Sequence, residues 1–400
     1  MRAILAVLIG KLLRFLVRLV RPGGGSALPG VVANKLDPNL LSNALAALDH
    51  GLVVVSGSAG KSSTTSYLVT LLEAHGLRVF TNSSTANIRQ GLVASVLKQG
   101  NWRGRLDCDI AVLELDEGHG AVLAGELNVR LAVLTNVLSD QLDRFNDPDD
   151  VIAMLKQIGS AASAVVLNVD DKNLAQLEFG APVVGFGLSA AMAKTRRALY
   201  ALNFGPHPTI PVFTEASQDC IVVHSEVETK FGITGLPEHQ ALNLSAAVAA
   251  LYQLIEPSQS AVSAVIKDLK PVFARNEMVQ VSGVDVMIRL VQNPTSFQLN
   301  LDELLPDQVP LMFMAGRDIH DPSWLWTVDF SRVKKVDIVG GFNAHELALR
   351  LVFAGVEVGA VIEDATAAAD GFLELPGTGH TLLFSADAMR RVRRHWGLAK

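Results

Sequence analysis

The 400-residue chain is 49% hydrophobic and 18% charged, so it is long and apolar enough for two or three buried cores. Its net charge of −6 excludes the basic footprint of a nucleic-acid-binding protein, and no nucleic acid partner is expected. Cys108 and Cys220 are too few for a disulfide framework or a zinc ligand set, and they indicate a reducing, cytoplasmic setting.

The first segment, residues 1–21, is strongly apolar but interrupted by cations. Lys11, Arg14, Arg18 and Arg21 follow one another at spacings of three, four and three, which places them on one face of a helix. Two interpretations stay open: an interfacial helix at the inner face of the membrane, or a helix packed on its own domain. A signal peptide is less favoured, because the apolar core before Lys11 is short.

A Pro- and Gly-rich stretch, residues 21–30, ends this helix, and residues 1–45 form the predicted N-terminal helix and linker. Residues 46–270 then alternate between apolar strands and helical stretches. The expected strands are 52–56, 77–81, 109–116, 130–136, 163–171 and 181–187, and the expected helices include 62–75 and 242–255. This order predicts a parallel α/β sheet. Residues 199–234 lack helical periodicity and predict a short β insertion.

Residues 271–400 predict a second, smaller unit that is again α/β and Rossmann-like. Its expected strands are 309–316, 334–341, 356–362 and 380–385, and its expected helices are 344–353, 365–372 and one that ends at Trp396. The boundary between the two units is predicted within residues 268–279. The fold class is therefore a central parallel-sheet domain followed by a smaller α/β domain.

A short glycine-rich loop, Gly57-Ser-Ala-Gly-Lys-Ser62, joins the first strand to the first helix of the sheet. Gly57 and Gly60 permit positive φ and close backbone approach. The helix N-terminus favours an anion, Lys61 adds a charge for β- and γ-phosphates, and the Ser62 hydroxyl can ligate Mg²⁺. The loop therefore predicts a phosphate site; the alternative is a glycine-rich turn with a surface lysine.

Carboxylates follow at the end of the third strand. This position is next to the phosphate loop in a parallel sheet, so it suits a ligand for a phosphate-bound metal ion. Glu114 and Asp116 alternate with apolar residues, and Glu117 opens the next loop. The alternative is a charged strand end, and His119 is expected to be a surface histidine. The fourth strand leads into Asn136, Asp140, Asp143 and Arg144. By themselves these four residues favour a solvated helix start.

Together these stretches resemble the Mur ligase superfamily, whose ATP loop has the short form GTxGKTT or GTxGKST. SGSAGKSSTT, TNSSTANIRQGL, LELDEGH, LTNVLSDQLDRF and VVLNVDD are similar in order and spacing to its central ATPase domain. The match is closer to the MurT-like branch, the ATPase subunits of lipid II isoglutaminyl synthase. The stretches that resemble this branch are GSALPGVVANKLDPNLL, SDQLDRF, PVFARNEMVQVSGVDVMIRLVQNPTSF and DPSWLWTVDF. The resemblance covers nearly the whole chain.

The resemblance implies ATP and Mg²⁺ as cofactors, with Lys61 on the phosphates and Ser62 and Glu114 as Mg²⁺ ligands. The nucleotide contacts that it implies are Gly57, Ser58, Gly60, Lys61, Ser62, Ser63, Asn87, Asn136, Asn243 and Arg275. Asp321 takes the place of the third member of a Cys-His-Asp triad whose other members lie on a partner. An Asp-Pro turn is the alternative for Asp321, and Asp318 takes the place of another family aspartate.

The implied activity is amidation of the D-glutamate α-carboxyl in the lipid II stem peptide, which leaves D-isoglutamine. A GatD-like glutamine amidotransferase subunit would form a heterodimer with this chain and supply ammonia. A carboxylate is a poor electrophile, and γ-phosphate transfer gives it a good leaving group, so catalysis is mostly positioning and charge neutralisation. Two alternatives remain: a Mur-type amino-acid ligase, and a non-catalytic nucleotide-binding scaffold for a glutaminase partner.

The chain departs from the family's patterns at several positions that bear on activity. Ala59 replaces an Asn of the loop, Gln292 the Lys of KNP, His320 an Arg, and Thr327 the Asp of WLWD. Typical members also carry a zinc ribbon with cysteine ligands in the central domain. The corresponding residues 199–234 hold only Cys220, and His207, Cys220, His224 and His239 lack ribbon spacing, so no zinc site is expected.

Overall fold

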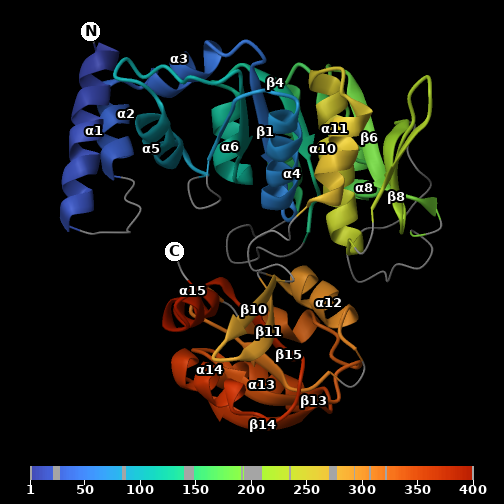
Figure 1. The fold of residues 1–400 in the computed structure, drawn as a ribbon. Helices are drawn as coiled ribbons and strands as arrows, with labels where there is room; N and C mark the ends of the chain where they lie inside the picture. Colours follow the sequence, from blue (N-terminus) through green and yellow to red (C-terminus); the bar gives the residue numbers. More distant parts are fainter. Residues whose placement is uncertain are drawn as a thin grey trace. The chain divides into compact units, whose positions relative to one another are not determined.

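The computed structural model divides the chain into two compact units, drawn in Figure 1. The first unit takes the described residues up to Leu269, and the second takes those from Glu277 onward. The structure describes residues 2–20, 28–82, 87–138, 148–190, 192, 210–233, 236–269, 277–291, 293–305, 308–319 and 322–398. Each unit is described by itself below.

The described part of the first unit is built on a nine-stranded sheet with the order β2-β3-β1-β4-β5-β6-β7-β8-β9. The strands are β1 (Leu52–Ser56), β2 (Val79–Thr81), β3 (Ile110–Glu114), β4 (Val129–Leu134), β5 (Val165–Asn168), β6 (Val183–Leu188), β7 (Val212–Ala216), β8 (Cys220–Val223) and β9 (Thr229–Gly232). Strands β1 to β7 pair in parallel, whereas β7, β8 and β9 form antiparallel pairs. The described part of the predicted insertion, residues 210–233, thus extends the main sheet.

The helices that connect the parallel strands are α4 (Lys61–Ala74), α5 (Arg89–Gln99), α6 (Glu117–Ala124), α7 (Pro148–Ser160) and α8 (Lys172–Ala175). Two more helices, α10 (Glu238–Leu254) and α11 (Gln259–Lys267), follow the last strand of the sheet. Helices α4 and α10 pack against each other, as Figure 1 shows. All five residues of β1 and all five of β3 are buried, which explains their unbroken apolar sequences.

The N-terminal helices α1 (Arg2–Val20), α2 (Leu28–Leu36) and α3 (Leu40–Ala46) belong to the same unit. Helix α1 packs on α2 and α5, and α2 packs on α5 (Figure 1). The packed face of α1 carries small side chains, because Ala6 and Val7 are fully buried and Gly10 lies against Leu97. Helix α1 is therefore docked on its own unit through one face.

The second unit contains a six-stranded sheet with the order β10-β11-β15-β12-β13-β14. Its strands are β10 (Glu277–Val281), β11 (Val284–Leu290), β12 (Leu311–Met314), β13 (Lys335–Gly340), β14 (Glu357–Ile362) and β15 (His380–Phe384). Its helices are α12 (Pro294–Asp302), the 3-10 helix η3 (Pro322–Thr327), α13 (Ala344–Phe353), α14 (Ala365–Leu373) and α15 (Ala386–His395). Among the described strands of this second sheet, only β10 and β11 pair antiparallel.

Alternate residues of β12 enter two separate cores, one on each face of this second sheet. Leu311 and Phe313 pack in one core with α13, and Met312 and Met314 pack in the other with α14 and α15. The prediction of two α/β units, a larger parallel-sheet unit and a smaller Rossmann-like one, is confirmed.

The strand order of the first unit determines where a ligand can approach. Strand β1 lies between β3 and β4, and the chain leaves β1 toward β2 on one side and returns to β4 on the other. Such a change of direction opens a crevice at the carboxyl ends of parallel strands. The loop after β1 lies at this point, followed by α4.

Candidate active site

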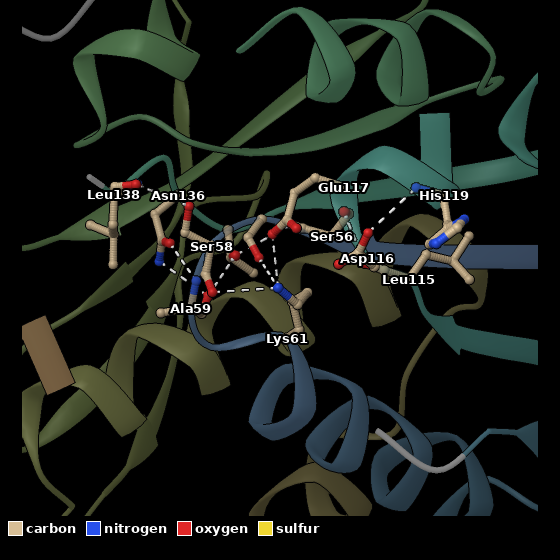
Figure 2. Close-up of polar contacts among 12 residues, drawn as sticks. Ser56, Ser58, Ala59, Lys61, Leu115, Asp116, Glu117, His119, Asn136 and Leu138 are labelled. Carbon is tan, nitrogen blue, oxygen red and sulfur yellow. Dashed lines mark hydrogen bonds and ion pairs between the residues drawn. The ribbon is translucent and has the colours of Figure 1, made fainter. Parts of the chain in front are cut away.

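The loop between β1 and α4 is held in place by the segment that follows β4. Ser58 N donates to Asn136 O at 2.9 Å, and Ala59 N donates to Asn136 Oδ1 at 2.8 Å. Asn136 Nδ2 returns a bond to Ala59 O at 3.2 Å, and Thr135 Oγ1 donates to the same carbonyl at 2.7 Å. Figure 2 shows this arrangement, in which Asn136 bonds to the loop through both ends of its side-chain amide.

Two glycines are required in this loop for both conformation and space. Gly57 has φ +132° and Gly60 has φ +84°, a backbone region that other residues rarely adopt. A Cβ on Gly57 would lie 2.3 Å from Thr135 Oγ1, and a Cβ on Gly60 would lie 2.4 Å from Asn243 Oδ1. Asn243 is buried in α10, so α10 contacts the loop directly at Gly60.

Helix α4 begins at Lys61 without a side-chain cap. Its N-cap residue is Gly60, in the left-handed conformation, which has no side chain to cap the first turn. An uncapped helix N-terminus presents N–H groups and a partial positive charge to an anion. Ser62 is partly buried, whereas Ser63 is 1% exposed.

Lys61 is folded back over the loop and paired with a buried carboxylate. Its Nζ lies 2.8 Å from Glu117 Oε1 and also donates to the carbonyls of Gly57 and Ser58 (Figure 2). The side chain of Glu117 is 1% exposed and that of Lys61 is 12% exposed. Among the described residues, Glu117 Oε2 has no hydrogen-bond partner. Glu117 therefore holds the loop lysine with one oxygen and leaves the other available.

The end of β3 is fixed by two neighbouring strands. Glu114 lies in register with Val55 of β1, and it is 5% exposed. Asn82, directly after β2, accepts from Glu114 N at 2.9 Å and donates to Glu114 O at 2.9 Å. Ser56 Oγ donates to Leu115 O at 3.0 Å. The backbone that carries Glu114 into the crevice is thus bonded on both sides.

Asp116 and Glu117 occupy the start of α6. Asp116 is the N-cap and accepts from His119 N at 3.4 Å, and Glu117 is the first helical residue. Carboxylates in the first turn are stabilised by the helix dipole. The same turn therefore anchors Glu117 and directs it at Lys61.

Polar residues at the end of β5 and just after it support the segment that holds the loop. Asn168 Nδ2 donates to Thr135 O at 2.8 Å, and Asp171 Oδ2 accepts from Val137 N at 2.6 Å. Asp171 also caps α8 by accepting from the amides of Asn173 and Leu174. Burial raises the pKa of the Asp171 carboxyl to about 6. Sequence analysis did not single out Asn82, Asn168 or Asp171, because each acts through a partner distant in sequence.

Several residues predicted from the sequence lie outside the described part of the chain. They are Asp140, Asp143, Arg144, His207, Arg275, Gln292, His320 and Asp321. Asn87 is described: it is partly buried and lies just before α5. The structure therefore brings together Gly57, Ser58, Gly60, Lys61, Glu117, Asn136 and Asn243. Ser62 and Ser63 follow in the first turn of α4, and Glu114 ends the neighbouring strand β3.

In the second unit, Asp318 is fixed at the carboxyl ends of β12 and β15. Ser385 Oγ donates to Asp318 Oδ1 at 2.6 Å and accepts from Gly316 N at 2.8 Å. Asn343 Nδ2 donates to Gly316 O and to Ile319 O, both at 2.9 Å. Thr327, at the end of η3, donates to Trp324 O at 2.7 Å. The described residues on either side of Asp321 are therefore held by side-chain bonds.

The donors at the loop fit magnesium better than zinc. The Ser62 hydroxyl, the Glu114 carboxylate and the unpartnered Glu117 Oε2 are hard oxygen donors, which Mg²⁺ prefers. In the parts of the chain that the structure describes, no cluster of three or more His, Cys, Asp or Glu side chains could hold a metal by itself. Any Mg²⁺ here would therefore also need oxygens from a phosphate ligand or water.

Two protein-family models match this chain, and one of them covers the loop described above. Residues 55–251 match the family model of the Mur ligase middle domain, and residues 290–378 match that of the MurT ligase C-terminal domain. The chain belongs to the Mur ligase superfamily, in its MurT-like branch. The family predicted from the sequence is confirmed, and the clamped loop lies within the Mur ligase middle domain.

Relatives of the same branch match along nearly the whole chain. The MurT subunit of lipid II isoglutaminyl synthase (glutamine-hydrolyzing) from Staphylococcus aureus is 25% identical, over 91% of this chain and 90% of the relative. That from Streptococcus pneumoniae is 26% identical, over 89% and 88%. A solved MurF ligase from Thermotoga maritima in complex with ADP shares the Mur ligase fold, with a TM-score of 0.65 and 18% identity over 92% of this chain and 83% of that one.

Proposed function

We propose that this chain is the ATP-dependent subunit of an amidating carbon–nitrogen ligase. Its substrate would be the D-glutamate α-carboxyl of the lipid II stem peptide, and its product D-isoglutamine. Transfer of the γ-phosphoryl group from ATP to a carboxylate oxygen would release ADP and form an acyl phosphate. Ammonia would then attack the acyl carbon, and the C–O bond to phosphate would break, which leaves an amide and inorganic phosphate.

The observation that carries this proposal is the match to MurT subunits along most of the chain. The relatives named lipid II isoglutaminyl synthase subunit cover about nine-tenths of the sequence, and the C-terminal match is to a model specific to MurT ligases. An amino-acid-adding Mur ligase would share the middle domain but would not explain that C-terminal match. Amidation is therefore the better-supported reaction.

The geometry of the loop supports a role in phosphoryl transfer. The uncapped start of α4 and Lys61 would bind the β- and γ-phosphates, and Ser62 and Glu114 would hold Mg²⁺, which when bound neutralises phosphate charge. Glu117 would keep the Lys61 ammonium over the loop while that group exchanges the carbonyls of Gly57 and Ser58 for phosphate oxygens. Positioning and charge neutralisation supply most of the catalysis in such reactions.

The substitution at Ala59 does not weaken the loop in this structure. Ala59 bonds to Asn136 through its backbone N and O, and Thr135 Oγ1 donates to the same backbone O. The asparagine common at this position in the family would thus add a side chain without replacing any of these three bonds. The structure therefore gives no support to a scaffold that has lost catalysis through this loop.

The ammonia source would be a glutaminase-type partner subunit of the GatD kind, completed by Asp321 as the acid that orients the partner's histidine. An exposed apolar patch on η3 and α13 supports such an interface. Its members are Trp326, Leu349, Val352 and Phe353, which are 51–70% exposed. Aromatic side chains exposed in this way are enriched where proteins associate. A lipid-linked substrate would place the heterodimer at the inner face of the cytoplasmic membrane.

The test is co-expression with a glutaminase-type partner, followed by mass analysis of lipid II after incubation with ATP, Mg²⁺ and glutamine. The expected product has the mass change for replacement of a carboxyl hydroxyl by an amino group, and Lys61→Ala abolishes it. Lys98→Ala, at an exposed position on α5, is the matched control and keeps the activity. ADP release that needs an added amino acid but no glutamine, or ATP binding without modification, contradicts the proposal.

A further inference from the structure

Helix α1 carries an apolar stripe on the face turned away from its own unit. Its members are Leu5, Leu8, Leu12, Phe15, Leu16 and Leu19, which are 46–64% exposed. They recur every three or four residues, so they lie on one face of the helix. Leu28 and Val31 of the adjacent α2 are exposed by 51% and 37%. A surface with this many large apolar side chains marks an interaction site.

The opposite face fixes the orientation of α1. A Cβ on Gly10 would lie 2.6 Å from Leu97 Cδ1 and 3.3 Å from Ala33 Cβ, so the helix backbone approaches α2 and α5 closely. Lys11 Nζ donates to Gly100 O at 2.6 Å, which ties the middle of the helix to the end of α5. The stripe is therefore presented by a packed helix.

The charges of α1 differ from those of the rest of the chain. The helix contains Arg2, Lys11, Arg14 and Arg18 and no acidic residue, whereas the whole chain has a net charge of −6. Within the described residues, no helix is long and apolar enough to cross a bilayer. A helix with an apolar stripe, a local excess of cations and no spanning length has the properties of one that lies in a membrane interface.

We propose that α1 docks this unit on an anionic phospholipid surface, with the leucine and phenylalanine stripe inserted between lipids. An anionic lipid surface fits better than a protein, because the stripe lies on a helix that contains four basic residues and no acidic one. The local cations complement acidic head groups. The inference rests on the proposed function in one respect, since a lipid-linked substrate would explain why the unit needs a membrane contact.

The test is flotation of the full chain, co-expressed with its glutaminase-type partner, with vesicles of phosphatidylcholine and phosphatidylglycerol in equal amounts. The wild-type complex is expected to float, more weakly when phosphatidylglycerol is left out. The double variant Leu8→Gln/Leu12→Gln is expected to bind the vesicles at least about tenfold more weakly than the wild type. Leu305→Gln, at a 70% exposed leucine of the second unit, is the matched control and is expected to float like the wild type.

Three results overturn the proposal. The wild type does not float with vesicles of either composition; the double variant floats as well as the wild type; or light scattering shows that the double variant has lost a second copy of the chain or the partner. Unchanged circular dichroism and melting temperature exclude misfolding, because both leucines are exposed. The vesicles contain no substrate or nucleotide, and amidation of a lipid-free stem peptide is measured separately, so this proposal and the proposed function fail independently.

Discussion

The loop after β1 and helix α1 lie in the same unit but distribute polar and apolar groups in opposite ways. At the loop, polar groups are buried: Glu117 is 1% exposed, Glu114 5% and Asn243 8%. On α1, large apolar groups are exposed, among them Leu12 at 58% and Leu19 at 64%. Both patterns are unfavourable for an isolated folded chain unless something compensates them.

The compensation differs between the two regions. At the loop most of it is internal, because strand ends, Asn136 and Lys61 satisfy the buried groups, and a nucleotide has only to replace a few of those bonds. On α1 it must come from outside the unit, since the described neighbours cover only the opposite face. Polar substitution should therefore be tolerated on α1, whereas even a methyl group should not be tolerated at the loop.

The largest effect is expected for Gly60→Ala. The new Cβ would meet Asn243 Oδ1 at 2.4 Å with φ at +84°, so we expect a loss of about 3–4 kcal/mol in unfolding free energy and loss of ATP binding. Gly76→Ala is the matched control, because Gly76 has φ +82° and nothing lies within 4 Å of its Cβ position. Its expected loss is about 1 kcal/mol, from conformation alone.

Urea unfolding of the two variants, followed on the transition of the first unit, measures this difference. Isothermal titration with ATP measures the second effect. Equal losses of stability in the two variants would show that Asn243 does not confine the loop, and the comparison with α1 would then lose its main support.

A smaller effect is expected for Glu117→Gln. The amide keeps the shape of the side chain but removes the charge that holds Lys61, so kcat/KM for ATP should fall about ten- to a hundredfold while the fold is retained. Glu126→Gln is the control: Glu126 is 51% exposed and pairs with Arg89 at the surface, where such pairs contribute little. Steady-state kinetics of ADP release provides the measurement, and wild-type kinetics for Glu117→Gln would rule out the positioning role.

The fold could be predicted from the sequence because its signals are local. Unbroken apolar strands, the glycines of the loop and the end of α4 just before Gly76 are each set by a few neighbouring residues. The ion pair and hydrogen bonds that hold the loop in place could not be predicted in this way. Lys61 and Glu117 are 56 residues apart, and Asn136 is 77 residues from Ala59. No local pattern specifies such pairs, since they depend on which strands become neighbours.

For helix α1, too, the sequence could not predict the contacts that form in the fold. The sequence left open whether the helix packs on its own domain or contacts a membrane, because an amphipathic pattern does not say which face is buried. The structure buries the small residues Ala6 and Gly10 and exposes the leucines. Lys11, which the sequence places on one helix face with Arg14 and Arg18, donates to Gly100 O. The two interpretations are therefore compatible, one for each face.

The central claim, that ATP activates a carboxylate as an acyl phosphate, is tested most directly by an oxygen-18 label in the α-carboxyl of the D-glutamate in lipid II. The co-expressed complex is incubated with ATP, Mg²⁺ and glutamine, and the released inorganic phosphate is analysed by mass spectrometry. We predict one labelled oxygen in phosphate for each amide formed, because the carboxyl oxygen leaves with the phosphoryl group. Amide formation with unlabelled phosphate would contradict the account.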